Sequence, residues 1–519
     1  MVLLNMGEIL KVHAKKHPRK IALKDWRGKA LTYHELESRT NRLANGLLNM
    51  GLRKGDRIAV MLYNCAELVE IYCALAKIGV VAVPVNWRFV GKEIEYVVNH
   101  SDSKAMILYE DFVDVINPVR SSFKKVKEKN YMVVGHTAPE GYANYERLIA
   151  KSSDRVPEVK VDSKETWMQI YTSGTTGTPK GVVRSHESYI LSYLIEALEF
   201  GFSEKDYGMI VMPLYHVNST FYGPLFLYIG ASLYVGRDKG FNPVELLRVI
   251  SREKITFTSL IPTHYAMILN VPEGVRKKYN VSSVRKLLCS SAPVRGQIKK
   301  EILKCFPNVK LYEAYGSTEA GLVTILRPED QLRKLGSMGK ECLGTDVIKL
   351  LNEDGNEVSV GEVGELYSRG PMMFDEYYKE PEKTEDSFRG DLFSAGDLVK
   401  RDEEGYYYIV ERKDNMVITG GEHVYPSEVE EIISQHPKVF DVAIVGVPDD
   451  VWGEAVKAVV VLKDGEAATE EEIIEWCRRR MAGFKKPKSV DFISDSEMPR
   501  TTTGKILHRK LREKYSQTL

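Results

Sequence analysis

The sequence predicts an α/β protein: a large N-terminal domain of parallel-rich sheets with helices plus a small β-barrel-like part, followed by a small α+β C-terminal domain. Strands and helices alternate through the first part of the chain, which is typical of parallel sheets covered by helices. After about residue 340 the pattern changes to short β runs joined by Asp-Gly and Glu-Gly turns. At 519 residues the chain is also too long for a single core.

The N-terminal elements follow from apolar periodicity and from start and stop signals. Residues 31–51 open with a Thr32-x-x-Glu35 capping box and end at Gly51, where a helix C-terminus favours positive φ. Short apolar runs without helical periodicity predict strands, and amphipathic stretches between them predict helices. The expected strands are 57–63, 80–85, 105–109, 167–171 and 309–316; the expected helices include 65–79, 91–101 and one ending near Phe306.

The C-terminal part has the size and alternation of a small α+β domain. Ser427-x-x-Glu430 and Thr469-x-x-Glu472 predict two capped helices, and residues 441–447 and 455–463 predict strands. We therefore predict a large domain, 1–413, with subdomains at about 1–180, 181–335 and 336–413, and a small domain, 414–519.

Composition excludes several classes of protein. Lys and Arg number 73 against 72 Asp and Glu, so no global basic field exists to recruit nucleic acid. The six Cys are scattered without a CxxC pair and indicate free thiols in a reducing compartment. The N-terminus lacks a signal-peptide pattern, and the most apolar stretch is broken by Lys77 and too short to span a membrane. We expect a cytoplasmic protein with no membrane span and no nucleic-acid partner.

The stretch YTSGTTGTPKGV, residues 171–182, concentrates glycines and hydroxyls in front of Lys180. It is not a P-loop, because Gly174 and Gly177 have the wrong spacing and Lys180 follows Pro179; it also contains no G-x-G-x-x-G. Backbone N–H groups and hydroxyls closed by one cation suit the β- and γ-phosphates of a nucleotide. On this stretch alone, a solvent-exposed Ser/Thr/Gly loop remains possible.

Five further motifs follow in order: MPLYH (212–216), YEAYGSTEAG (312–321), SAGDL (394–398), ERKDNMVITGGEHVYPSEVE (411–430) and PRTTTGKI (499–506). Together with the loop they resemble the adenylate-forming superfamily of acyl-CoA synthetases, adenylation domains and luciferases, over nearly the whole chain. The resemblance implies an ATP-dependent, AMP-forming acid–CoA ligase that uses ATP, Mg²⁺ and coenzyme A. A carboxylate first displaces pyrophosphate from ATP to give an acyl-adenylate, and the CoA thiol then displaces AMP.

The resemblance also implies roles for single residues. Thr318 would contact the α-phosphate, Glu319 would bind Mg²⁺ with Thr175 as a second ligand, and Lys505 would contact both the carboxylate and the α-phosphate. Asp397 and Arg412 would hold the ribose, although Ala395 replaces the threonine usual in that motif. The remaining nucleotide contacts would come from the phosphate loop and from the residues around the base: Thr172, Ser173, Gly174, Thr175, Thr176, Gly177 and Lys180; Ala292, Pro293, Glu313, Ala314, Tyr315 and Gly316. Two positions depart from the family pattern: residues 290–293 read SSAP in place of the more usual glycine-rich sequence, and Glu411 replaces a common glycine.

In the family the small domain is mobile and presents different faces to the two half-reactions. The resemblance implies that the pivot is Asp414 and that Gly420 and Gly421 line the tunnel for the pantetheine arm of CoA. The basic run 477–488 could meet the CoA phosphates or be a solvated face.

The acyl pocket is expected at His216, Val217 and Tyr315, with Phe221 and Tyr222 as further apolar candidates. No Asp occurs in 212–224, which argues against an α-amino acid substrate. A medium- to long-chain fatty acid is the first expectation, and an aromatic or alicyclic acid the second. The sequence is also compatible with an enzyme that loads a carrier protein and with a luciferase, whereas the presence of both Lys505 and Glu319 argues against a non-catalytic nucleotide sensor. A homodimer is possible.

Overall fold

The computed structural model describes residues 5–172, 179–290, 294, 296–420, 422–478, 480–501 and 504–516. It contains two compact units. Unit 1 comprises Met1–Gly336, Glu341–Val347 and Ser368–Phe393, and unit 2 comprises Ser337–Lys340, Ile348–Tyr367 and Ser394–Leu519. The predicted boundary at Asp414 therefore lies inside unit 2, and it stays a prediction.

An eight-stranded sheet in unit 1 has the order β19-β9-β8-β4-β3-β5-β6-β7. Neighbours from β8 to β7 pair in parallel, whereas β8–β9 and β9–β19 pair antiparallel. Its strands are β3 (Arg57–Met61), β4 (Val81–Pro84), β5 (Ala105–Tyr109), β6 (Tyr131–Val134), β7 (Ala143–Asn144), β8 (Thr166–Thr172), β9 (Lys180–Ser185) and β19 (Glu376–Tyr377).

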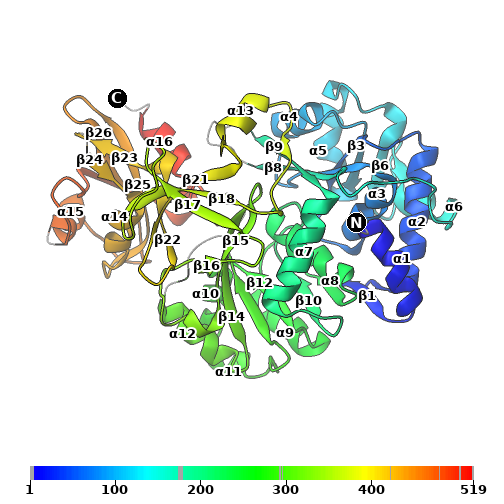
Figure 1. Ribbon diagram of the computed structural model, residues 1–519, viewed down its shortest axis with the longest axis horizontal. Coiled ribbons are helices and arrows are strands. Elements are labelled where there is room, and N and C mark those ends of the chain that lie inside the picture. Colours follow the sequence, from blue (N-terminus) through cyan, green and yellow to red (C-terminus); the bar gives the residue numbers. More distant parts are fainter. Residues whose placement is uncertain are drawn as a thin grey trace. The chain divides into compact units, whose positions relative to one another are not determined.

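A nine-stranded sheet in the same part of the chain has the order β16-β15-β14-β13-β12-β10-β11-β1-β2 (Figure 1). From β14 to β1 every neighbouring pair is parallel, and β14–β15 and β1–β2 are antiparallel. Its strands are β1 (Ile21–Asp25), β2 (Ala30–Thr32), β10 (Tyr207–Ile210), β11 (Ser232–Val235), β12 (Phe257–Leu260), β13 (Lys286–Cys289), β14 (Lys310–Ser317), β15 (Gly321–Leu326) and β16 (Lys340–Glu341).

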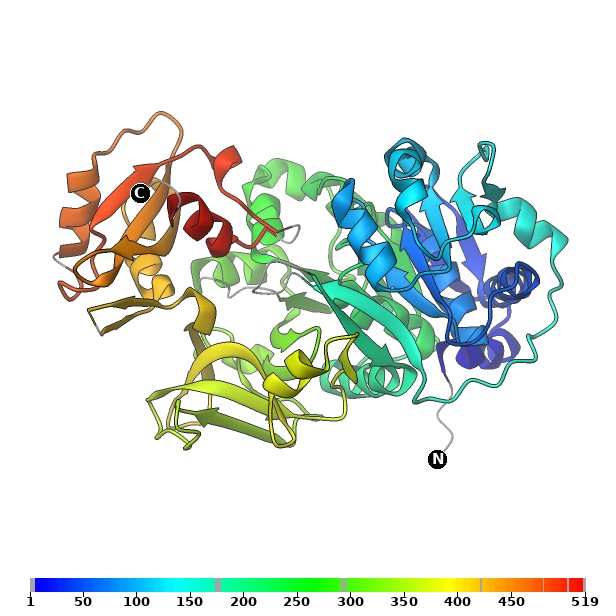
Figure 2. The same cartoon turned by 90° about the horizontal axis from the view of Figure 1, so that it is seen from above.

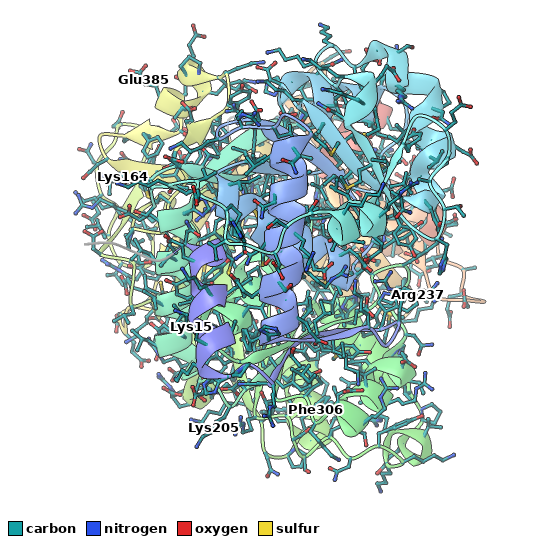
Figure 3. The ribbon with its side chains drawn as sticks, turned by 90° about the vertical axis from the view of Figure 1, so that its right-hand side faces the viewer. Lys15, Lys164, Lys205, Arg237, Phe306 and Glu385 are labelled. Atoms are coloured by element: carbon teal, nitrogen blue, oxygen red, sulfur yellow. The ribbon has the colours of Figure 1, made fainter. Side chains whose placement is uncertain are left out.

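Helices connect these parallel strands, as the alternation predicts. The helices are α1 (Met6–Lys16), α2 (Tyr33–Asn49), α3 (Ala66–Ile78), α4 (Lys92–His100), α5 (Val113–Ile116), α6 (Tyr145–Lys151), α7 (His186–Phe200), α8 (Val217–Tyr228), α9 (Pro243–Glu253), α10 (Pro262–Asn270), α11 (Glu273–Arg276), α12 (Gly296–Cys305) and α13 (Pro381–Asp386). Lys15 points outward from α1, whose other face packs against α2 and α3 (Figure 3). None of the helices within the described residues is long and apolar enough to cross a membrane.

The capping signals at α2 are confirmed. The Thr32 hydroxyl accepts from the Glu35 N–H while the Glu35 carboxylate accepts from the Thr32 N–H, which satisfies two donors at the helix start. Beyond the other end, Gly51 adopts a φ of 97°, a conformation that costs glycine little.

A curled sheet forms the predicted β-barrel-like part, and its β20–β21 and β21–β22 pairs are antiparallel. It has the order β17-β18-β21-β20, with β22 also paired to β21. The strands are β17 (Val347–Leu351), β18 (Val363–Arg369), β20 (Phe388–Arg389), β21 (Leu392–Arg401) and β22 (Tyr407–Arg412). The last strand runs directly into the 3₁₀ turn η5 (Lys413–Asn415).

The rest of unit 2 is the predicted α+β part, with the sheet order β24-β23-β26-β25 and β27 paired parallel to β26. Its elements are β23 (Val417–Thr419), β24 (Glu422–Val424), α14 (Pro426–Ser434), β25 (Val439–Asp449), β26 (Gly453–Leu462), α15 (Glu470–Arg478), β27 (Ser489–Phe492) and α16 (His508–Ser516). Figure 2 shows α16 beside this sheet, where it packs on β25.

One of the two predicted capping boxes in this region is wrong. Thr469 does cap α15, because its hydroxyl accepts from the Glu472 N–H at 3.2 Å. Ser427, in contrast, lies inside α14, which begins after Tyr425 with Pro426 in its first turn. The Ser427 hydroxyl donates to the Val410 carbonyl instead. Pro426 fixes a helical φ, so the helix starts earlier than the capping pattern indicates.

Candidate active site

The predicted phosphate loop is the connection between β8 and β9. The two strands pair antiparallel up to the Thr172–Lys180 pair, so the loop is closed at its base by the sheet itself. The Lys180 ammonium lies 4.6 Å from the centroid of the Tyr377 ring on β19. Ser173, Gly174, Thr175, Thr176 and Gly177 lie outside the described residues, as do Ala292, Pro293 and Gly421, and the predictions for all eight stay predictions.

Thr318 and Glu319 occupy a tight turn at the carboxyl end of β14. The Ser317 hydroxyl accepts from the Ala320 N–H at 2.9 Å and closes the turn. A side chain at Gly316 would collide with the Gly321 carbonyl oxygen, so the β14–β15 pairing requires glycine there. This edge, at the carboxyl ends of parallel strands, is where open α/β sheets bind ligands.

A buried arginine that no sequence motif indicates supports this turn. Arg184 of β9 donates to the Thr318 carbonyl at 2.6 Å and also to the Met372 carbonyl. The Tyr377 hydroxyl donates to a Glu319 carboxylate oxygen at 3.0 Å. Arg184 could not be found from periodicity, because β9 is buried on both faces from Gly181 onward and shows no alternation.

On the side predicted for the adenine base, the Glu313 carboxylate binds Val294, which follows β13 in the chain. It accepts the Val294 N–H at 3.1 Å and pairs with the buried Lys299 of α12. Burial raises the pKa of Glu313, and Lys299 and the Val294 N–H oppose that shift. Ala314 and Tyr315 are half-buried on the same strand, and Tyr315 pairs with Thr324 of β15.

The structure brings together the two residues predicted to hold the ribose. Asp397 of β21 is directly opposite Arg412 of β22, and their side chains form an ion pair of 3.0 Å. Asp397 is buried, and Gly396 before it has a φ of 80°. A paired carboxylate beside a guanidinium is well suited to a vicinal diol, because it accepts two hydrogen bonds.

Lys505 lies in a turn closed by Thr501. The Thr501 N–H donates to the Lys505 carbonyl at 2.7 Å, and the Lys505 N–H donates to the Thr501 hydroxyl at 3.1 Å. The pKa of Lys505 is lowered by partial desolvation and by the Arg412 guanidinium, while Asp397 and Glu411 oppose the shift. The charged groups of the predicted ribose site therefore contribute to the pKa shift of Lys505.

The predicted pivot is an exposed residue in a short turn. Asp414 is in η5, and its carbonyl accepts from Arg512 of α16 at 3.1 Å. Gly420 has a φ of 59°, and its N–H donates to the Trp452 carbonyl at 2.8 Å.

His216 is the N-cap residue of α8, and Val217 is the first residue of that helix. Burial lowers the pKa of His216 to about 4, with Arg88 adding to the shift, so the imidazole is neutral at neutral pH. Phe221 and Tyr222 are only 6% and 4% exposed and belong to the hydrophobic core.

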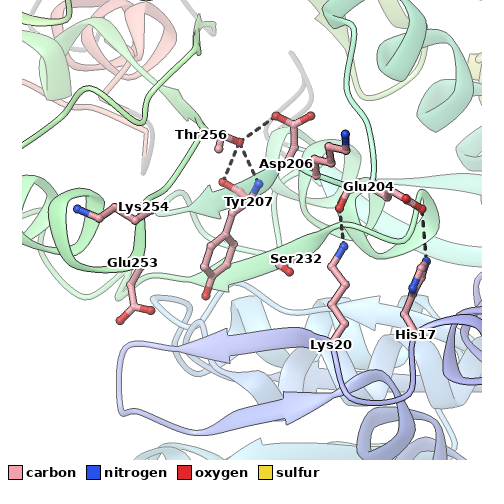
Figure 4. Close-up of a pocket in the computed structure, with 10 residues that line it drawn as sticks. His17, Lys20, Glu204, Asp206, Tyr207, Ser232, Glu253, Lys254 and Thr256 are labelled. Carbon is pink, nitrogen blue, oxygen red and sulfur yellow. Dashed lines mark hydrogen bonds and ion pairs between the residues drawn. The ribbon is translucent and has the colours of Figure 1, made fainter.

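A cavity of 410 Å³ lies at the opposite edge of the nine-stranded sheet (Figure 4). Its lining includes Tyr207 and Ser232, the first residues of β10 and β11, and Thr256, which precedes β12. Because ligands of parallel sheets bind at the carboxyl ends of strands, we do not assign the active site there.

The residues at the β14 turn fit a magnesium ion held together with a nucleotide. No group of three or more His, Cys, Asp or Glu side chains in the described part of the chain could hold a metal alone. Mg²⁺ in nucleotide enzymes typically takes one or two carboxylates and completes its octahedron with phosphates and water. The Glu319 carboxylate is a hard oxygen ligand of that kind.

Family models match most of the chain. Residues 10–378 match the model of the AMP-binding enzyme family, and residues 428–505 match the AMP-binding enzyme C-terminal domain. The long-chain-fatty-acid–CoA ligase FadD13 of Mycobacterium tuberculosis is 32% identical over 99% of both chains. A feruloyl-CoA synthase of Amycolatopsis is 32% identical over 94% of both.

Solved structures give the same result. The anthranilate CoA ligase AuaEII in complex with anthranoyl-AMP superposes with a TM-score of 0.88 at 27% identity, covering 99% of this chain and 98% of that one. O-succinylbenzoate CoA synthetase of Bacillus subtilis, in complex with ATP and magnesium, has a TM-score of 0.83 at 27% identity, covering 97% and 98%.

The protein is therefore an adenylate-forming enzyme. The chain belongs to the AMP-binding enzyme family, and it is an AMP-forming acyl-CoA ligase that uses ATP, Mg²⁺ and coenzyme A.

Proposed function

We propose that the turn at the end of β14, the Asp397–Arg412 pair and Lys505 hold ATP for attack by the carboxylic acid. The phosphate loop at 172–180 binds the β- and γ-phosphates, and Thr318 contacts the α-phosphate. Asp397 and Arg412 hold the ribose. The observation that carries this proposal is the 3.0 Å ion pair between Asp397 and Arg412, the two residues predicted to hold the ribose.

In the first half-reaction a carboxylate oxygen attacks the α-phosphorus, and pyrophosphate leaves with the electrons of the broken P–O bond. The Lys505 ammonium stabilises the negative charge that develops at the α-phosphoryl oxygens. Glu319 and Thr175 would hold Mg²⁺, which would supply positive charge against the phosphates. In the second half-reaction the CoA thiol, losing its proton, attacks the acyl carbonyl and AMP departs; Gly420 and Gly421 would line its path.

The acid is proposed to be a medium- to long-chain fatty acid bound at the start of α8, near His216, Val217 and Tyr315. Residues 212–228 contain no Asp, Glu, Lys or Arg, and His216 is neutral at neutral pH. An uncharged acyl tail avoids the desolvation cost that a second charge would incur there. The similarity to FadD13 over almost the full length supports the same choice.

An aromatic acid is the second candidate. The similarity to a feruloyl-CoA synthase is equally high, at 32%, and the structurally similar AuaEII is an anthranilate CoA ligase. The half-buried Tyr315 would stack on such a ring.

Replacing Lys505 by Ala tests the assigned mechanism. Adenylate formation should fall by at least about 10²–10³, as for other lost groups that stabilise a transition-state charge. Thioester formation from supplied acyl-AMP should be retained. Pyrophosphate exchange measures the first step and CoA-thioester formation the second; equal losses in both would refute the role.

A substrate screen tests the proposed acid. Pyrophosphate release is measured with saturated acids of graded length, with ferulate and with indoleacetate, followed by mass spectrometry of the CoA thioester. We expect the highest kcat/KM with a medium- or long-chain acid. Preference for ferulate would establish an aromatic substrate, and adenylate without a CoA thioester would indicate a carrier-protein acceptor.

We also propose a cytoplasmic enzyme. All six cysteines are free thiols, and five of them are buried, which suits a reducing compartment. A homodimer stays a prediction that light scattering of the purified protein would test.

A further inference from the structure

Glu411 links the two sides of the predicted pivot at Asp414. It is the residue before Arg412 on β22, and it is only 7% exposed. One carboxylate oxygen accepts from the Asn415 side-chain amide at 3.1 Å and from the Arg412 N–H at 2.8 Å. The other accepts from the Ser427 N–H, in the first turn of α14, at 2.9 Å. One side chain thus satisfies donors both before and after Asp414.

Ser427 adds a second link across the same point. Its hydroxyl donates to the carbonyl of Val410 on β22. The first turn of α14 is therefore tied to β22 through both a backbone and a side-chain donor. N–H groups in the first turn of a helix have no partner within that helix, and the Glu411 carboxylate supplies one to Ser427. The helix dipole also favours a negative charge at the N-terminus of α14.

From α14 the contacts continue to the segment that carries Lys505. Glu430, one turn further along α14, accepts from the Ile444 N–H at 2.8 Å and lies 2.6 Å from the His508 imidazole. His508 is the first residue of α16 and follows Lys505 by three positions. A continuous path thus runs from β22, beside the Asp397–Arg412 pair, through α14 to Lys505.

We propose that Glu411 is a positioning residue for adenylate formation: it acts as a latch that holds the small domain in the orientation in which Lys505 serves the ribose–phosphate site. The inference rests on the proposed role of Lys505. A rotation of residues 415–516 about Asp414 has to break the hydrogen bonds from Asn415 and Ser427 to residues 410 and 411. Two of these bonds, from the Asn415 side-chain amide and the Ser427 N–H, end on the buried Glu411 carboxylate, and hydrogen bonds to a charged acceptor are stronger than those to a neutral one.

The test separates the two half-reactions in Glu411→Gln. Using the best wild-type substrate among dodecanoate, ferulate and indoleacetate, pyrophosphate exchange measures adenylation. CoA-thioester formation from the corresponding synthetic acyl-AMP measures the second step. We expect adenylation to fall by about tenfold or more, because a charge-assisted acceptor is lost, and thioester formation to be unchanged or faster.

Two further variants separate a latch from a charge effect on Lys505. Ser427→Ala removes the link to Val410 without changing any charge, and it should shift the two rates in the same directions as Glu411→Gln. Glu431→Gln makes the same chemical change at an exposed position of α14 and should leave both rates at wild-type values. An adenylation defect in Glu411→Gln that Ser427→Ala does not share would overturn the latch and assign the effect to the charge.

Two more results would refute the inference without contradicting the proposed function: equal losses in both half-reactions, or unaltered adenylation in both latch variants. A wild-type protein that forms no adenylate from any of the three acids refutes the proposed function instead. If Glu411→Gln does not fold, as judged by thermal unfolding, the rates of Ser427→Ala decide the question. Ser427 is only half-buried, so its replacement by Ala should leave the fold intact.

Discussion

Glu196 is a buried acid for which the mechanism has no use. It lies in α7 with a fully buried side chain, and neither carboxyl oxygen has a hydrogen-bond partner among the described residues. Burial raises its pKa well above the ordinary value, with the charge of Arg184 opposing. The folded state therefore holds a proton that the unfolded chain releases above about pH 4.3.

The sign of the pH dependence follows from that proton. The contribution of Glu196 to stability is greatest at pH values below its pKa in the unfolded chain. It falls as the pH rises towards its pKa in the folded protein, because in this range only the unfolded state ionises freely. Glu196→Gln should remove this decline, so its advantage in melting temperature over wild type should grow between about pH 4.5 and 7.

Glu196→Met should raise the free energy of unfolding at pH 7 by about 1–3 kcal/mol, because it replaces an unsatisfied polar group with an apolar one of similar length. Denaturant unfolding at pH 7 measures this difference. Destabilisation by both substitutions would show that the carboxyl group has a partner and a structural role.

At the scale of elements, the His508–Glu430 contact fastens α16 to α14. Burial alone lowers the pKa of His508, but the hydrogen bond and charge of Glu430 outweigh it, and the pKa lies above 6.5. The charged pair therefore stabilises unit 2 fully below about pH 6.5, and this contribution is lost as the pH rises through the elevated pKa.

His508→Gln should accordingly cost about 1.5–3 kcal/mol below pH 6.5, the value of a hydrogen bond to a charged group, and progressively less at alkaline pH. Scanning calorimetry of wild type and variant between pH 5.5 and 9 measures the difference. A difference in melting temperature that does not vary with pH would mean that the imidazole is neutral throughout.

Elements differ in how far their sequence determines them. The Thr32–Glu35 box and Gly79, in the left-handed conformation after α3, locate helix ends because the signal and its partner are close in the chain. Ser427 carries the same signal, yet it contacts Val410, seventeen residues earlier. A local pattern cannot reveal that a distant carbonyl competes for the hydroxyl.

For the whole molecule, Asp414→Pro tests the pivot. Proline fixes φ and disfavours helical backbone at Lys413, so the turn should no longer interconvert. One half-reaction should therefore fall much more than the other. The two rates are measured as for Lys505→Ala, and equal rates in the variant would argue against a hinge at this position.

The sequence by itself determined the α/β class, the order of most elements, the adenylate-forming family and the residues that carry its motifs. It could do so because periodicity and caps act within a few residues, and because six ordered motifs are specific in combination. Only the tertiary structure decided that Arg184 supports the Thr318 turn, that Glu313 pairs with Lys299 and that Glu411 joins β22 to α14. Those contacts link residues that the chain alone does not bring together, and burial gives them their strength, so no local pattern predicts them.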